Sequence, residues 1–319
     1  MKNYNHVIKK KKIPQLFILG MYRSGTTAIA RFLAGEHKIA FCSDPIRPFF
    51  NWYRTKLQKD INCSDVEDHT RPLGDYFQGN INYINKLKLS KFSEKVKEEE
   101  IKNIRKSIIE HGLEYSPKFI NNLAQSSNFS SITYADELKF YLSLIMHTYG
   151  NDDTSLIGLK EVWSIEMALP IIKMIGDDAK ILVVIRDPLD IMASSLSGSN
   201  NYCILTLARQ WRKQIVFYNY LKFLYPNQVT SINYEDFCRD PNVLKVKIGS
   251  LIDNSEEVFS EKYNLSDDYG KSWIKNSSYS NQKLTSLIDD KSIGKYLKIN
   301  PYDQPAVELI KKETKKILI

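Results

Sequence analysis

A stretch near the amino terminus combines the residue types that bind anionic groups. Residues 20–27 read GMYRSGTT. Glycine permits a tight turn and a close approach of a ligand to the backbone, and the free amides at the start of a helix attract an anion. Hydroxyl and guanidinium groups add further donors. The candidate anion-binding residues are Arg23, Ser24, Gly25, Thr26 and Thr27. An ordinary polar turn is the alternative interpretation, because turns favour the same residue types.

The loop shares the Gly-x-x-x-x-Gly spacing of the Walker A nucleotide-binding loop but lacks its lysine. Thr26 stands where that motif requires lysine. The loop therefore suits a phosphate-like group, and it suits magnesium-dependent transfer of a γ-phosphoryl group poorly.

A second candidate anion site follows an apolar segment. Arg186 directly follows the apolar residues 181–185. Pro188 then opens a predicted helix, and Ser194 lies about two helical turns into it. An arginine at a strand end and a serine on the following helix can converge on one anion. The alternative for Arg186 is a structural ion pair with Asp187 or Asp190.

Alternating strand and helix patterns must position these residues. Short apolar segments predict strands at 15–19, 38–42, 156–159, 181–185 and 229–232. Helices are predicted at 26–35, 134–149, 164–175, 189–196, 203–224 and 242–252. This alternation predicts an α/β fold of three layers, with a central parallel sheet flanked by helices. We expect one domain over residues 1–319.

Residues 45–135 interrupt the alternation and predict a mainly helical insertion that forms an acceptor site or a lid. Within it, residues 94–109 predict a solvent-facing amphipathic helix, because acidic residues precede basic ones. Four aromatic residues could stack on an acceptor or form the core of the insertion. They are Phe49, Phe50, Trp52 and Tyr53.

The two anion-binding segments together resemble the sulfotransferases that use 3′-phosphoadenosine 5′-phosphosulfate (PAPS). Residues 20–27 are similar to the loop for the 5′-phosphosulfate, in the Arg-Ser-Gly-Thr-Thr form of tyrosylprotein-type and bacterial members. Arg186 and Ser194 are similar to the residues that bind the 3′-phosphate. The resemblance covers residues 15–45 and 155–300. It implies a P-loop NTPase-like fold, PAPS as co-substrate and a hydroxyl-bearing acceptor such as a carbohydrate, lipid or small molecule.

The same resemblance assigns roles to further residues. Lys160, at a strand end, is similar to the lysine that contacts the transferring sulfuryl group, and Glu161 is its possible ion-pair partner. Tyr234 is similar to a tyrosine beside the adenine, or it is a packed aromatic residue. A carboxy-terminal segment would either bind the 3′-phosphate or form a turn. It contains Asn276, Ser277 and Ser278.

The implied reaction is in-line attack of an acceptor hydroxyl on sulfur, with release of 3′-phosphoadenosine 5′-phosphate (PAP). Arg23 and Lys160 would stabilise the charge that develops, and no metal is required. Asp44 follows the second predicted strand and is either the general base or the cap of a helix that begins near Pro45. The alternatives to a sulfotransferase are a P-loop-type kinase and a catalytically inactive PAP-binding module.

Composition limits the class of protein. The 319 residues are 43% apolar and 26% charged, as in a globular protein, and the net charge of +8 is compatible with an anionic ligand. The sequence has no helix with a basic face interleaved with aromatic residues, which is the pattern that would predict nucleic-acid binding. The four cysteines are scattered and no segment predicts a signal peptide or a transmembrane helix, so we expect a cytoplasmic protein. The sequence leaves the oligomeric state open.

Overall fold

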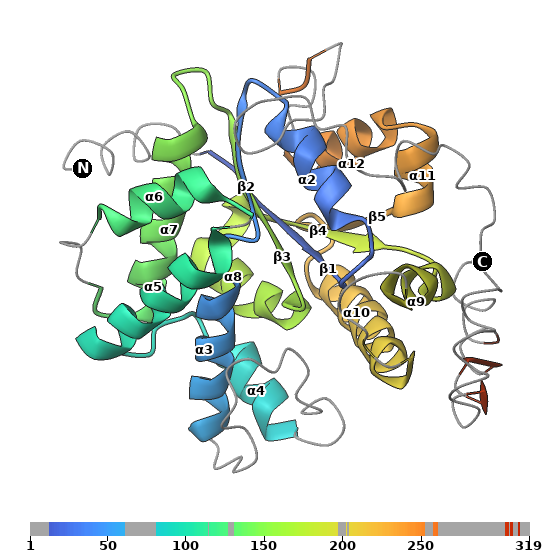
Figure 1. The fold of residues 1–319 in the computed structure, drawn as a ribbon, viewed down its shortest axis with the longest axis horizontal. Helices are drawn as coiled ribbons and strands as arrows, with labels where there is room; N and C mark the ends of the chain where they lie inside the picture. The colour runs from blue at the N-terminus through green and yellow to red at the C-terminus, as the bar shows by residue number, and fades with distance from the viewer. Residues whose placement is uncertain are drawn as a thin grey trace.

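Five parallel strands form the central sheet of the protein. The computed structural model describes residues 13–60, 81–113, 115–126, 131–196, 202, 204–252, 258–260, 304–305, 307–308 and 312. The strands are β1 (Gln15–Gly20), β2 (Ile39–Ser43), β3 (Leu156–Val162), β4 (Ala179–Ile185) and β5 (Val229–Asn233), in the order β2-β3-β1-β4-β5 (Figure 1). All neighbouring pairs are parallel. The predicted α/β architecture is confirmed, and the carboxyl ends of all five strands meet at one edge.

Helices cover both faces of the sheet (Figure 1). One face packs against α2 (Thr26–Ala34), α11 (Tyr234–Arg239) and α12 (Asn242–Ile252). The other packs against α7 (Tyr134–Tyr149), α8 (Ala168–Ile175), α9 (Pro188–Leu196) and α10 (Ile204–Leu224). Strand β1 supplies side chains alternately to these two cores, Leu16 and Ile18 to one and Phe17 and Leu19 to the other. This alternation follows from the two-residue period of a strand, and it explains why β1 is apolar throughout.

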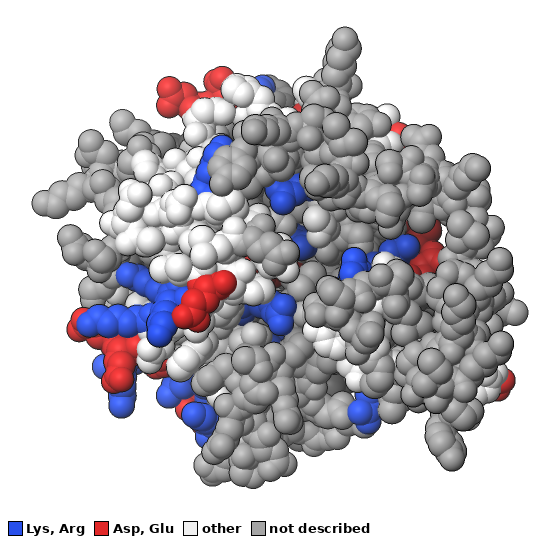
Figure 2. Space-filling model, in the orientation of Figure 1, with Lys and Arg blue, Asp and Glu red and all other residues white. Residues whose placement is uncertain are grey.

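The described residues between β2 and α7 are mainly helical. It forms α3 (Arg47–Lys59), α4 (Ile81–Leu89), α5 (Glu98–Gly112) and α6 (Pro117–Ala124). Helix α5 begins at Glu98 rather than residue 94, and only one of its faces meets solvent. Its isoleucines at 101, 104 and 108 are buried, because their helical spacing gathers them on one side against the neighbouring helices. Over this region, at the left of Figure 2, acidic and basic side chains lie intermixed.

Of the two interpretations of the aromatic residues of α3, the core one holds for three of them, and stacking on an acceptor does not. Phe49, Phe50 and Tyr53 are fully buried. They pack on Phe92, Tyr134 and Tyr141, with ring centroids 4.3–6.4 Å apart. Helix α3 buries them because it needs an apolar face to dock on the helical layer. Trp52 is partly buried and packs against the same core.

None of the helices in the described ranges combines the length and apolarity that a bilayer crossing requires. Over the same residues, no group of three His, Cys, Asp or Glu side chains is placed to hold a metal ion. Cys42 and Cys238 form no disulfide within the described residues.

Candidate active site

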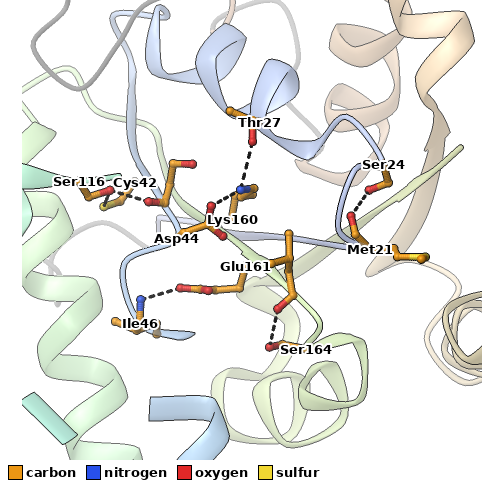
Figure 3. A network of polar contacts seen from close by, with 12 residues as sticks. Met21, Ser24, Thr27, Cys42, Asp44, Ile46, Ser116, Lys160, Glu161 and Ser164 are labelled. Carbon is orange, nitrogen blue, oxygen red and sulfur yellow. Dashed lines mark hydrogen bonds and ion pairs between the residues drawn. The ribbon is translucent and has the colours of Figure 1, made fainter. Parts of the chain in front are cut away.

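The loop between β1 and α2 is held in an unusual backbone conformation. Arg23 and Gly25 both have positive φ angles, 63° and 89°. The Ser24 hydroxyl donates to the Met21 carbonyl at 2.6 Å, and the Ser24 amide donates to the same oxygen at 3.1 Å (Figure 3). Ser24 is fully buried, so its hydroxyl shapes the loop from within. The turn presents the start of α2 at the carboxyl edge of the sheet.

The first amides of α2 are available for a ligand. No described group accepts from the amides of Gly25, Thr26 or Thr27. The Thr26 side chain is buried against Gly20, where an added Cβ would lie 2.4 Å from Thr26 Cγ2. Thr27 is exposed at the end of the sheet. Together the amides and the dipole of α2 form a site for a phosphate-like anion.

Arg186 connects the end of β4 to this loop. Its Nη1 donates to the Arg23 carbonyl at 2.9 Å, and its guanidinium carbon lies 5.0 Å from the centre of the Tyr234 ring. Arg186 Nε is buried without a hydrogen-bond partner among the described residues. Helix α10 supports this strand end, because Trp211 Nε1 donates to the Arg186 carbonyl at 3.0 Å. Both predicted cationic segments therefore meet at one place.

The predicted alternative for Arg186, a structural ion pair, is not made within the part of the chain that the structure describes. The Asp187 carboxylate instead accepts from the Leu189 amide at 2.7 Å, at the start of α9. Burial raises the pKa of Asp190 to about 6, against the opposing charge of Arg186. Ser194 lies half-buried on the same helix.

Tyr234 lies beneath the loop. It is 1% exposed, and a Cβ at Gly25 would lie 2.0 Å from its Cδ2 atom. Burial raises the pKa of its hydroxyl above the ordinary value. The ring thus fills the space that glycine leaves open and carries Arg186 on its face, as a packed aromatic residue would.

Lys160 and Asp44 face one another across the ends of β3 and β2. Lys160 is 2% exposed, and its ammonium group contacts the Asp44 carboxylate and lies 3.4 Å from Thr27 Oγ1 (Figure 3). The second Asp44 oxygen is buried and has no hydrogen-bond partner among the described residues. Asp44 does not cap α3, because that helix has Ile46 at its N-cap and no side-chain cap. The structure thereby joins the anion loop to a buried carboxylate through Lys160.

Glu161 is not the ion-pair partner of Lys160, contrary to the sequence-based suggestion. Consecutive strand residues point to opposite faces, so the Glu161 side chain leaves β3 away from Lys160. Its Oε1 accepts from the Ile46 amide at 2.6 Å (Figure 3). Sequence reasoning missed this contact, although the two-residue period of the strand already argued against a Lys160–Glu161 pair.

Asn276, Ser277 and Ser278 lie outside the described residues.

Comparison with known proteins identifies the family. A model of the sulfotransferase family matches residues 14–244. The chain belongs to the sulfotransferase family. The matched residues of this sulfotransferase include the loop after β1, Asp44, Lys160 and Arg186. Membership supports sulfotransfer as the class of activity.

Solved sulfotransferase structures are distant in sequence. The sulfotransferase domain of the Synechococcus PCC 7002 olefin synthase is 14% identical, with a TM-score of 0.45 over 88% of this chain and 85% of that one. Sulfotransferase STF1 of Mycobacterium tuberculosis H37Rv is also 14% identical, with a TM-score of 0.41 over 88% and 78%. Sulfotransferase STF9 of Mycobacterium avium is 12% identical, with a TM-score of 0.39 over 93% and 81%. No curated protein matches the sequence significantly.

Proposed function

We propose that this sulfotransferase moves the sulfuryl group of PAPS to a hydroxyl group of an acceptor and releases PAP. The observation that carries the proposal is the meeting of Arg186 with the β1–α2 loop, 2.9 Å from the Arg23 carbonyl. A nucleotide with phosphate groups at both its 3′ and 5′ positions needs two cationic sites within one molecular length. The two arginines would supply them from neighbouring segments that this hydrogen bond joins.

The donor groups fit such a nucleotide. The amides of Gly25, Thr26 and Thr27, with the Arg23 guanidinium, are suited to the 5′-phosphosulfate. Arg186 would hold the 3′-phosphate together with Ser194, and its buried Nε has no protein acceptor among the described residues. We assign Tyr234 a supporting role, since it lies under both the loop and Arg186. Asn276, Ser277 and Ser278 stay candidates for closing this site.

PAPS supplies an electrophilic sulfuryl group, and the protein supplies charge and a proton acceptor around it. Lys160, near Thr27, would stabilise negative charge on the oxygens of the group in transfer. Asp44 would accept the acceptor's hydroxyl proton on the oxygen that has no partner among the described groups. The Lys160 ammonium group contacts the Asp44 carboxylate, so the proposed proton acceptor lies beside the group that would stabilise the transferring charge.

Helices α3 to α6, within residues 45–135, are proposed to form the acceptor side of the site. Helix α3 begins at Arg47, three residues after Asp44, so its amino-terminal end is close in the chain to the proposed base. We treat residues 1–319 as one domain and this region as its insertion.

The proposal is tested by ligand binding followed by transfer. Calorimetric titrations would compare PAP, ADP and ATP, because only PAP has a 3′-phosphate for Arg186. Transfer of labelled sulfate from PAPS to pools of carbohydrates, lipids and small alcohols would then identify the acceptor. We expect PAP to bind at least tenfold more tightly than ADP. Equal binding of PAP and ADP, or tight binding of ATP with phosphoryl transfer, would refute the proposal. PAP binding without transfer to any acceptor would indicate an inactive PAP-binding protein.

A further inference from the structure

The turn that carries Asp44 is fastened to β3 at two points. The Asp44 amide donates to the Lys160 carbonyl at 2.7 Å, and the Ile46 amide donates to Glu161 Oε1 at 2.6 Å (Figure 3). Between these bonds, Asp44 adopts a φ of 51°, in the left-handed region. A residue other than glycine has a conformational cost there, and it persists only where surrounding contacts impose it. The two bonds are contacts of this kind.

The bond from Ile46 has a particular structural role. Ile46 is the N-cap residue of α3, and the helix has no side-chain cap of its own. The side chain of Glu161 therefore supplies the acceptor that this backbone amide needs, from a different element. Because Ile46 lies two residues after Asp44, this bond fixes where the chain leaves the turn, and hence where the Asp44 carboxylate points.

We propose that Glu161 is a positioning residue, which holds the Asp44 carboxylate against Lys160 by accepting the Ile46 amide. The inference rests on the proposed role of Asp44 as proton acceptor. Glu161 itself is fully buried and touches no reacting group in the proposed chemistry. Its effect on transfer would pass entirely through the backbone of residues 44–46.

The Glu161 carboxyl is fully buried and lies near other charged groups. Burial raises the pKa of its carboxyl well above the ordinary range, and the negative charge of Asp44 adds to the effect. The bond from Ile46 and the positive charges of Lys160 and Arg47 act in the opposite direction. Burial thus disfavours the ionised form of the Glu161 carboxyl. Its second oxygen, Oε2, has no hydrogen-bond partner among the described residues.

Two substitutions test whether position 161 needs a hydrogen-bond acceptor or a negative charge. Glu161→Gln keeps the acceptor oxygen and removes only the ability to ionise, whereas Glu161→Leu keeps the approximate volume and removes the acceptor. We expect the glutamine variant to retain PAP affinity, kcat and the pH profile of the natural protein to within about twofold. The leucine variant should bind PAP normally and lose about tenfold to a hundredfold in kcat, because small displacements of a reacting group are costly.

Hydrogen exchange of the Ile46 amide gives a readout that needs no substrate. In the free protein, the amide should stay protected in Glu161→Gln and exchange at least tenfold faster in Glu161→Leu. Protection that is unchanged in the leucine variant would overturn the proposal. Loss of kcat in the glutamine variant equal to that in the leucine variant would also overturn it, because the charge would then be what matters. If Glu161→Leu does not fold, Glu161→Ala serves for the same exchange measurement.

Glu166 provides a matched control, as a second fully buried glutamate in the same segment. It is ionised, because the positive charges of Arg54 and Lys213 overcome the effect of burial and lower its pKa to about 2. Glu166→Gln should therefore lower the unfolding midpoint clearly, while Glu161→Gln leaves it almost unchanged. PAP titration of the natural protein tests the sulfotransferase proposal separately. A protein that binds no PAP but shows the expected exchange pattern would support the contact between Glu161 and the Ile46 amide and would refute the proposed sulfotransfer.

Discussion

At the scale of single residues, Arg186 has a donor group left for a ligand. One donor, Nη1, binds the Arg23 carbonyl, and the buried Nε has no described acceptor. We expect Arg186→Ala to weaken PAP binding roughly tenfold to a hundredfold, because a hydrogen bond to a charged group contributes about 1.5–3 kcal/mol. Isothermal titration calorimetry measures the change. Arg239→Ala is the control, since Arg239 is exposed and pairs with Asp236 on its own helix. Equal PAP affinity in both variants would contradict the assignment.

Asp44 can be tested with little change of shape. Asp44→Asn keeps the side-chain volume and removes the proton acceptor next to Lys160. Because general-base catalysis contributes about 10²- to 10⁴-fold, we expect turnover to fall within that range while PAP affinity changes little. Steady-state kinetics and PAP titration of the same preparation separate the two effects. Turnover at the natural rate would show that another group accepts the proton.

At the scale of elements, Gly25 lies where β1, α2 and Tyr234 meet. Its φ is 89°, and an added Cβ would overlap the Tyr234 ring at 2.0 Å. We expect Gly25→Ala to lower the unfolding midpoint and to abolish PAP binding, because the loop must move to admit the methyl group. Gly176→Ala is a matched control. That glycine has a φ of 78° but no atom within 4 Å of an added Cβ, so it reports the conformational cost alone. Thermal unfolding should show a larger drop in the unfolding midpoint for Gly25→Ala than for Gly176→Ala. Equal drops would refute the packing argument.

The sequence predicted the elements better than the contacts between them. Five apolar segments gave the strands because each strand of a parallel sheet is buried on both faces, and the loop after β1 was evident from its glycines and hydroxyls. The partner of Lys160 was not evident from the sequence. Asp44 is 116 residues away from Lys160, and only the pairing of β2 with β3 brings the two together. The aromatic residues of α3 were ambiguous for a similar reason, because an aromatic face can dock on a core or on a ligand.

At the scale of the whole molecule, one buried ionic cluster joins three distant segments. Arg54 on α3 donates to Glu166 at 2.9 Å, and Lys213 on α10 lies 2.9 Å from the other oxygen of that carboxylate. Glu166 belongs to η1 (Ile165–Met167), the turn that follows β3. Arg54 also donates to the Trp163 carbonyl at 2.9 Å. The helical region after β2, the sheet and α10 are thereby tied together. No local pattern could predict this cluster, since its members are far apart in sequence and each is an ordinary surface residue type.

This cluster predicts how stability depends on pH. Glu166 has a folded-state pKa of about 2, below its ordinary value of 4.5, so the unfolded chain binds more protons between these values. The contribution of Glu166 to the free energy of unfolding is therefore present above about pH 4.5 and is lost as the pH falls toward 2. We expect Glu166→Gln to lower the free energy of unfolding by about 3–5 kcal/mol at pH 7, because it leaves Arg54 and Lys213 without a counter-charge. Urea unfolding at pH 7, 5 and 3 should show the difference from the natural protein shrinking at the lowest pH. A difference that stays constant would mean that Glu166 contributes through its shape and hydrogen bonds, with no net contribution from its charge.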